Sequence, residues 1–506
     1  MKMKKTLGVK FVLGALAAMC VAPSSAADAE AHRDAFTLEG PARTNLFRQA
    51  DFKWMVTPRH DYSKTYVTKL FLSQAEFDRE YLGKYKMRDN GKQTVRMTYE
   101  QAFEAIKGMD EISLGLPKIV YLVGWQYNGH DSKYPAFFEG NRKLARACDK
   151  DPLDGVRWLM REGKKYHTAV SLHINLFDAY DDSPLFDEYV RADVLAKDKD
   201  GKFILGDWAY KVDYASEFAK GLLQKRVDRL CSLLPVQEAG TIHVDAFHSR
   251  VPLPCVRPDG KVAIKFVSPI SPWHGGTHEK DIAAKKNIVK YFDSKGIDIT
   301  TEGVDGMDVG GIGEGWFPMY WHYGSRDLAL SLKASQACGG NVYGSQCAFG
   351  RNVNGEMLFM HNPDVAKALD VFKGEFCKTV LICQYLNTFG RKALIEGKNG
   401  SIGVFEGGVR TMWKGGRLSV AKDGEVLCDG SDLFIPAVWL GNGAVVAYSE
   451  KGCRDRKWKI PSGTRLAQTA KAWTINASGR TEFTKFTIDG DTVTITLSPN
   501  EMVLIQ

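Results

Sequence analysis

The sequence predicts an α/β protein made of a (β/α)8 TIM-type barrel, with a short N-terminal lead-in and a C-terminal all-β, sandwich-like domain. Strand-like and helix-like runs alternate from about residue 97 to residue 388, which is typical of a parallel sheet with buried strands. The length of this region fits a closed barrel better than an open sheet. From about residue 391 the pattern changes to short strands that alternate apolar and polar residues, which indicates a second domain.

Four segments are predicted along the chain. Residues 1–26 have the features of a secretory signal: a basic start (MKMKK), an apolar stretch, and small residues before a cleavage point at Ala27. Residues 27–95 form an extended or partly β lead-in, residues 96–390 the catalytic barrel, and residues 391–506 the β domain. We therefore expect an exported protein, periplasmic or extracellular.

No membrane anchor and no polyanionic partner are expected. Lipid attachment at Cys20 is disfavoured because Met19, directly before it, is not the small residue that such a cleavage site needs. After the signal, no stretch reaches the ~18 consecutive apolar residues that span a bilayer. The formal net charge is +8, and four of the positive charges leave with the signal, which leaves +4. This small excess is spread along the chain, so neither nucleic acid nor an anionic membrane is predicted as a partner.

The barrel elements follow from apolar periodicity. A helix is predicted from Thr98, because Gln101 stands three residues later in the spacing of a capping box and apolar residues follow at helical intervals. The strand-like runs are 118–125 (KIVYLVGW), 168–175 (TAVSLHIN), 241–247 (TIHVDAF) and 296–303 (GIDITTEG). Helix-like runs lie between them at 151–166, 216–234 and 279–296.

In the β domain the clearest signal is a hairpin. Phe486 and Ile488 alternate before the turn Asp489–Gly490–Asp491, and apolar residues alternate after it. The ten cysteines show no CxxC pair and no zinc-ribbon spacing, and Cys428 with Cys453 is one possible bridge in an oxidising compartment.

Two acids end neighbouring predicted strands. Alternation places His243, Asp245 and Phe247 on the strand face opposite Ile242 and Val244, and functional side chains of barrels lie where strands end. The same count places Glu302 at the end of 296–303. Such a carboxylate pair is what a retaining glycosidase needs, at a separation of about 5–5.5 Å. The alternative for either acid alone is a salt bridge or a turn cap.

Polar and aromatic residues accompany the two acids at the same predicted rim. Asp, His, Asn and Gln can hydrogen-bond sugar hydroxyls, and Trp rings can stack on a pyranose. These residues therefore predict a sugar pocket. The candidates are Trp125, Gln126, His130, Asp131, His173, Asn175, His243, Trp273, Trp316 and Trp321.

The chain resembles the retaining α-N-acetylgalactosaminidases of glycoside hydrolase families 129 and 101 over roughly residues 115–330. The resemblance lies in four stretches, in this order: VGWQYNGHDSKYP, HIN, VDAF and ITTEG. The resemblance implies that Asp245 is the nucleophile, that Glu302 is the general acid/base, and that His130 and Asp131 bind hydroxyls of the terminal sugar. It also implies a double displacement that removes α-linked N-acetylgalactosamine from Ser or Thr of mucin-type O-glycans, with O-glycosylated proteins or glycopeptides as substrates.

Two departures favour the compact, exo-acting family 129. The segment between the acids carries an apparent insertion at 251–278, which could cover the aglycone with Trp273 as the expected contact. Val304–Asp305 follow Glu302 where the endo-acting family usually has an aromatic residue.

Other functions stay open at this point. They are an endo-acting enzyme that releases galactosyl-β-1,3-N-acetylgalactosamine, an α-galactosidase, and a carbohydrate-binding protein without catalysis. Zinc at His274 and His278 or at His243 and His248 is disfavoured, because the glycines of HGGTH indicate a loop rather than one helical face. The chemistry itself requires no cofactor, structural calcium is possible with ligands unknown, and no oligomeric state is predicted.

Overall fold

The computed structural model describes residues 36–46, 53–78, 88–205, 209–247, 254–256, 262–264, 270–301, 314–319, 351–352 and 355–506. The chain divides into two compact units, Met1–Thr37 and Leu38–Gln506, and all elements below belong to the second. The predicted signal, Cys20, Glu302, Trp321 and residues 251–253, 257–261 and 265–269 of the insertion lie outside the described residues.

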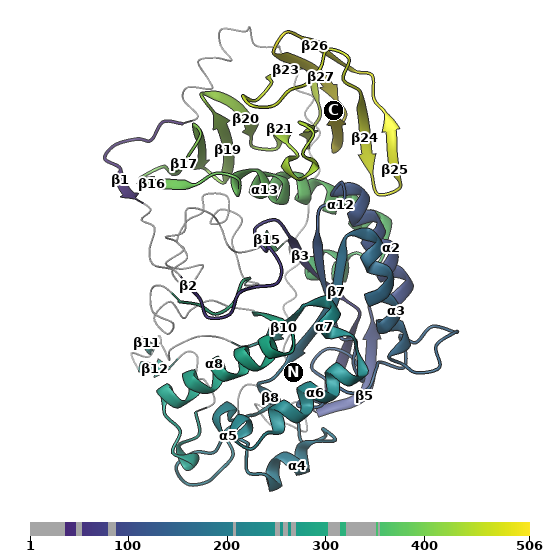
Figure 1. The fold of residues 1–506 in the computed structure, drawn as a ribbon, viewed down its shortest axis with the longest axis vertical. Helices are drawn as coiled ribbons and strands as arrows, with labels where there is room; N and C mark the ends of the chain where they lie inside the picture. The colour runs from purple at the N-terminus through teal and green to yellow at the C-terminus, as the bar shows by residue number, and fades with distance from the viewer. Residues whose placement is uncertain are drawn as a thin grey trace, which may run out of the picture. The chain divides into compact units, whose positions relative to one another are not determined.

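A six-stranded parallel sheet forms the centre of the α/β region (Figure 1). Its strands, in spatial order, are β13 (Asp298–Thr301), β10 (Thr241–Asp245), β7 (Thr168–Asn175), β6 (Lys118–Val123), β3 (Tyr66–Phe71) and β15 (Arg351–Asn352). The four predicted strands are confirmed and are neighbours in chain order. β3 was not predicted, because it lies in the presumed lead-in. In the described part of the chain, β13 and β15 are the two edges of the sheet.

Helices connect these strands, as the alternating pattern predicts. Thr98 caps the first of them with the expected capping box: its hydroxyl accepts from the Gln101 backbone N–H at 3.2 Å, and its own N–H donates to the Gln101 side chain at 2.9 Å. The helices of this region are α2 (Tyr99–Ile112), α3 (Asp154–Glu162), α4 (Phe186–Arg191), α5 (Tyr214–Ala219), α6 (Leu222–Leu233), α7 (Val236–Ala239) and α8 (His278–Ser294). α3 packs on β7 and α8 on β13, so helices bury the apolar strand face.

The two faces of the sheet differ in polarity. Ile242 and Val244 of β10 belong to the main apolar core with the helices, as alternation predicts. The opposite face carries buried polar groups that bond to one another. The Tyr121 hydroxyl lies 2.6 Å from Thr241 Oγ1, and the Thr300 hydroxyl donates to the Tyr121 oxygen at 3.0 Å. The inner face of this sheet is therefore polar, and its groups largely satisfy one another.

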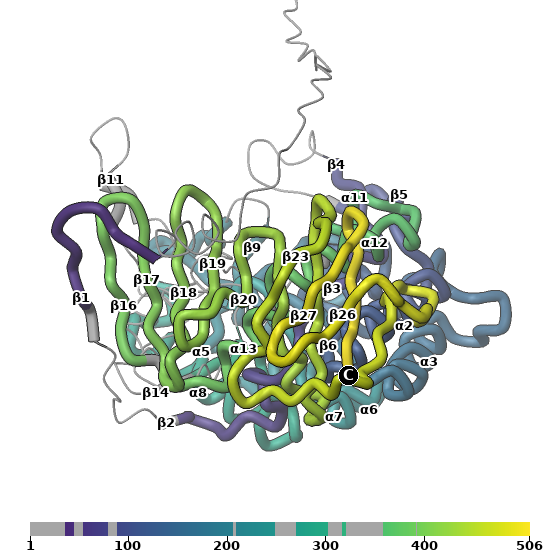
Figure 2. The backbone as a smooth tube through the Cα atoms, turned by 90° about the horizontal axis from the view of Figure 1, so that it is seen from above, coloured from purple at the N-terminus to yellow at the C-terminus, as the bar shows by residue number. Residues whose placement is uncertain are grey.

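The C-terminal region is antiparallel β structure. An 11-stranded sheet has the order β1-β16-β17-β18-β19-β20-β21-β22-β28-β24-β25, and a three-stranded sheet has the order β23-β27-β26. Figure 2 shows β16 to β20 side by side in this order. β1 (Arg43–Leu46), from the presumed lead-in, pairs with β16. The other strands are β16 (Arg391–Gly397), β17 (Gly400–Phe405), β18 (Val409–Lys414), β19 (Arg417–Lys422), β20 (Glu425–Asp429), β21 (Asp432–Pro436), β22 (Val445–Ser449), β23 (Cys453–Lys459), β24 (Ala472–Asn476), β25 (Gly479–Glu482), β26 (Phe486–Asp489), β27 (Thr492–Leu497) and β28 (Glu501–Ile505).

The predicted hairpin is confirmed as β26 and β27, with Ile488 opposite Val493. The suggested bridge is wrong: Cys428 and Cys453 are both free thiols, the first fully buried in a strand. A buried free cysteine serves as a small apolar side chain.

The remaining elements are short or connect the two regions. They are β2 (Lys53–Trp54), β4 (Ser73–Asp78), β5 (Arg88–Val95), η2 (Gly163–Tyr166), β8 (Asp178–Ala179), β9 (Tyr210–Lys211), β11 (Pro254–Val256), β12 (Val262–Ile264), η3 (Pro272–His274), β14 (Glu314–Gly315), α11 (Gly355–His361), α12 (Val365–Glu375), η5 (Phe376–Leu381), α13 (Ile382–Leu386) and η6 (Val438–Leu440). Among the described residues, no helix combines the length and apolar character needed to cross a bilayer.

Candidate active site

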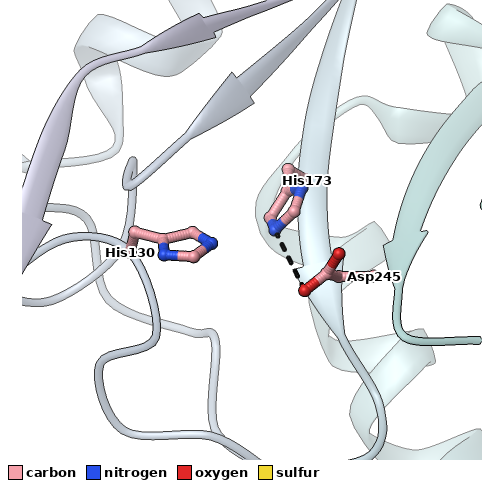
Figure 3. Close-up of side chains that lie close together, drawn as sticks. All are labelled: His130, His173 and Asp245. Atoms are coloured by element: carbon pink, nitrogen blue, oxygen red, sulfur yellow. Dashed lines mark ion pairs between the residues drawn. The ribbon is translucent and has the colours of Figure 1, made fainter. Parts of the chain in front are cut away.

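The candidate site lies where β6, β7 and β10 end. In the parallel register, His243 is opposite His173, and Asp245, the last residue of β10, is opposite Asn175. Carboxyl ends of parallel strands meet at one edge of a sheet, which is where ligands bind in α/β proteins. His173, Asp245 and His130, from the loop after β6, come together at this edge (Figure 3).

The loop after β6 is held against β4 by close backbone contacts. Gly124 and Gly129 have φ angles of +75° and +116°, and a Cβ on either would lie 2.0 or 2.7 Å from the carbonyl oxygen of Ser73. Only glycine tolerates both the conformation and the approach. The His130 N–H donates to the same Ser73 oxygen at 2.9 Å, so the glycines of the motif place His130 at the strand ends.

A second anchor fixes the same loop from β5. Asp89 Oδ2 accepts hydrogen bonds from the Ser132 hydroxyl at 2.5 Å and from the Asn128 amide at 2.8 Å. The serine of the GHDS motif therefore has a structural role. Between these anchors Asp131 has a φ of +62°, a conformation that non-glycine residues rarely adopt and that is enriched at functional sites.

His130 and Asp131 form the accessible polar part of the site. Their side chains are 20% and 18% exposed, and Nδ1 of His130 lies 3.2 Å from Asp131 Oδ2. The His130 ring also contacts the His173 ring, with centroids 5.2 Å apart. The two side chains offer a carboxylate and an imidazole to a ligand, as the sequence predicts for sugar hydroxyls.

His173 is buried beneath them and is uncharged. Burial holds the pKa of His173 well below its usual value, and the positive charge of Lys69 and the neighbouring histidines lower this pKa further. Its Nε2 is 3.9 Å from Asp245 Oδ2, which is too long for a hydrogen bond. Asp245 thus lies beside a neutral imidazole. The Asp245 side chain is 18% exposed.

Three predicted binding residues lie deeper than expected. His243 is fully buried, stacks on His173 at 5.3 Å, and its Nδ1 lies 3.1 Å from the Thr300 hydroxyl. Trp125 is also fully buried, and its indole N–H donates to the backbone oxygen of His173 at 3.1 Å. Gln126 is 1% exposed and donates to the Tyr134 hydroxyl at 3.0 Å.

The structure thus places Trp125 and Gln126 in the core, not on a pocket wall. Gly124, directly before these two residues, has a left-handed conformation with a φ of +75°. Both residues fix the base of the loop that carries His130.

Asn175 closes a turn. Its side-chain oxygen accepts from the backbone N–H groups of Phe177 and Asp178, and its amide donates to the Asp178 carboxylate at 2.9 Å. Lys211 donates to the other oxygen of this carboxylate at 2.6 Å. With these bonds made, Asn175 shapes the end of β7.

The predicted tryptophans lie apart from one another. Trp273 is 53% exposed on η3, where its backbone N–H donates to Lys197 and its ring packs over Gly201. Trp316 is 3% exposed and contacts Phe317. Trp321 and Glu302 lie outside the described residues; β13 ends at Thr301, which is opposite Val244.

Sequence reasoning missed several polar residues of this site. Lys69 of β3 is 3% exposed and interacts electrostatically with His173. Tyr134 and Tyr180 are buried, and burial together with the charge of Asp131 raises the pKa of each phenol, which keeps them protonated. A lysine inside the apolar run YVTKLF was the available signal, but β3 had not been recognised as a strand.

The comparisons with known proteins concern this same segment. Residues 84–251 match the family model of endo-α-N-acetylgalactosaminidases, glycoside hydrolase family 101. This segment includes His130, His173 and Asp245. The sheet shows an α/β protein, and over residues 84–251 the chain is similar to this glycosidase family, which confirms there the resemblance predicted from the motifs.

Solved structures match this chain at low similarity. The α-N-acetylgalactosaminidase NagBb from Bifidobacterium bifidum, in complex with GalNAc, matches with a TM-score of 0.45 and 11% identity, over 71% of this chain and 58% of that one. The chain therefore spans just over half the length of that relative. The GH36 α-galactosidase AgaB from Geobacillus stearothermophilus matches with a TM-score of 0.39 and 10% identity, over 88% of this chain and 55% of that one.

Proposed function

We propose that this chain is an exported retaining glycosidase that removes α-linked N-acetylgalactosamine from Ser or Thr of O-glycosylated proteins. The observation that carries the proposal is the position of Asp245. It ends β10, is partly exposed, and lies beside His173 and His130 within the segment that matches family 101. In this proposal the segments beyond the six described strands complete a (β/α)8 barrel, and residues 1–26 direct export.

The proposed mechanism is a double displacement. Asp245 attacks the anomeric carbon and forms a glycosyl-enzyme, while Glu302 protonates the leaving Ser or Thr oxygen. Glu302, now a carboxylate, then takes a proton from water, which attacks the same carbon and releases the sugar with retained configuration.

The surrounding residues have distinct tasks in this mechanism. His130 and Asp131 hold hydroxyls of the terminal sugar, because they are the exposed polar pair beside Asp245. His173 is buried as the neutral imidazole, 3.9 Å from Asp245 Oδ2, so it lies beside the attacking carboxylate without carrying a positive charge. Trp273, 53% exposed, is available to contact the aglycone.

The test uses p-nitrophenyl α-N-acetylgalactosaminide with the parent protein and three variants. Glu302→Gln should lower kcat by about 10²–10⁴-fold, the usual contribution of a positioned acid or base, and Asp245→Asn should remove most turnover because an amide cannot form the glycosyl-enzyme. Glu238→Gln is the matched control, since this 63%-exposed side chain pairs with Lys164 on the surface. Full activity in Asp245→Asn would remove the proposed nucleophile. Proton NMR of the first product must show the α-anomer; a β-anomer would contradict retention.

Endo action is the second candidate, and the family model favours it, because it describes endo-acting enzymes. The p-nitrophenyl glycoside of galactosyl-β-1,3-N-acetylgalactosamine separates the two. Release of intact disaccharide would assign endo action, and release from the monosaccharide alone would assign exo action. Equal cleavage of p-nitrophenyl α-galactoside would show that the pocket does not recognise the N-acetyl group.

A further inference from the structure

The ligand atoms of His130, His173 and Asp245 all lie within 4.8 Å of one another. Within the described ranges, no other set of three histidine, cysteine, aspartate or glutamate residues meets this condition. We propose that these three residues bind one zinc-class divalent cation, in competition with the sugar. Three protein ligands and one open position are the usual arrangement of an exchangeable zinc site.

His173 supplies the independent evidence for a ligand. It is 2% exposed, and neither ring nitrogen has a hydrogen-bond partner among the described residues. Leaving buried polar atoms unpaired costs about 1–3 kcal/mol each, so such a group needs an explanation. The ring is held by a tilted contact with the His130 ring at 5.2 Å and by stacking on His243 at 5.3 Å. In Figure 3 one ring nitrogen of His173 is directed at Asp245.

His130 is oriented as metal-binding histidines usually are. Its Nδ1 lies 3.2 Å from Asp131 Oδ2, which leaves Nε2 for a cation. Ligating histidines commonly donate their second ring N–H to a carboxylate, which fixes the tautomer and raises the basicity of the other nitrogen. In Figure 3 the His130 ring extends toward His173 and Asp245.

The ligand set defines the class of metal. Two imidazoles and one carboxylate suit Zn²⁺ or Co²⁺, whereas Ca²⁺ and Mg²⁺ require oxygen ligands. A cation bound by Asp245 would occupy the carboxylate proposed to attack the sugar. The consequence is reversible inhibition, and only this part of the inference rests on the proposed function.

The test measures metal binding directly. The full chain, stripped with a chelator, is titrated with ZnCl₂ by calorimetry and with Co²⁺ by visible absorption. We expect one saturable site per chain. His173→Phe, which keeps an aromatic ring in the stack, should abolish it. Asp131→Asn should weaken it by about 10–100-fold, as loss of an outer carboxylate does.

The control is His167→Phe, which removes a 58%-exposed histidine that pairs with Asp110 instead of Asp245. It should leave Zn²⁺ affinity unchanged. Absence of saturable binding in the parent, or equal binding by folded His173→Phe, would overturn the inference. Thermal melting without metal establishes which variants are folded.

Free N-acetylgalactosamine separates this inference from the proposed function. Displacement of the metal by the sugar would support both. Zinc that binds in the parent, is lost in His173→Phe and is not displaced by the sugar would support the metal site but remove Asp245 from the proposed sugar site.

Discussion

Arg226 on α6 should be essential for stability, because it joins three segments behind the candidate site. Its guanidinium is buried and pairs with the buried Glu217 at 2.8 Å. It also donates to the backbone oxygen of Leu176, after β7, at 3.1 Å, and to that of Pro135, at the end of the His130 loop, at 3.4 Å. Replacing Arg226 by Met keeps most of the side-chain length and removes all three interactions.

The expected loss follows from what remains behind. Removing one partner of a buried ion pair costs about 3–5 kcal/mol, because the other charge stays buried and unpaired. Burial already raises the pKa of Glu217, and the Arg226 charge opposes that rise. Without it, Glu217 must take up a proton or remain an uncompensated anion. Since domains have a total stability of about 5–15 kcal/mol, Arg226→Met should remove a large part of it.

The assay is urea unfolding followed by circular dichroism and tryptophan fluorescence. The double variant Arg226→Met with Glu217→Gln should be more stable than Arg226→Met alone, because it carries no unpaired buried charge. Lys225→Met on the same helix is the control: its pair with Glu188 is exposed, and such pairs contribute about 0–1 kcal/mol. The reasoning is refuted if Arg226→Met and Lys225→Met lower the free energy of unfolding equally.

Two further predictions concern Trp125 and His173. Trp125→Ala should lower the free energy of unfolding by about 3–5 kcal/mol, because the side chain is fully buried. Trp273→Ala should lower it by less than about 0.5 kcal/mol, because that side chain is on the surface. Equal losses would contradict the buried position of Trp125. The pKa of His173 in the folded state lies below its unfolded value of about 6.5. Below about pH 6.5, unfolding is therefore accompanied by uptake of a proton at His173. The free energy of unfolding should then fall by up to about 1.4 kcal/mol for each pH unit of acidification. His173→Phe lacks this proton uptake, so its free energy of unfolding should depend less on pH between about 6.5 and 5. If urea titrations give the parent and His173→Phe the same pH dependence, His173 is not buried in its neutral form.

Four strands of the parallel sheet could be predicted because their periodicity and length are local properties. β6, β7, β10 and β13 follow the predicted runs, and the strand face of Asp245 follows from alternation. β3 was missed because its neighbours in sequence lack a clear period. Its pairing partners β6 and β15 are distant in sequence, and only the folded sheet shows that it belongs there.

The site was predicted in its composition but not in its depth. Sequence places Trp125, His130 and His173 at strand ends, yet cannot show which side chains turn inward. That choice depends on the Ser73 carbonyl, which is far away in sequence and forces the turn at Gly124. In the structure, Trp125 belongs to the core and His130 lies at the candidate site.

The polar inner face of the sheet explains why the candidate site lies where it does. Buried polar groups on a strand face are tolerated only if they bond to one another. Tyr121, Thr241 and Thr300 satisfy one another in this way. His173, one step nearer the strand ends, is left without hydrogen bonds. Because this unfavourable burial occurs beside Asp245, at the edge where the strands end, it favours the proposed ligand, which would approach from the strand ends.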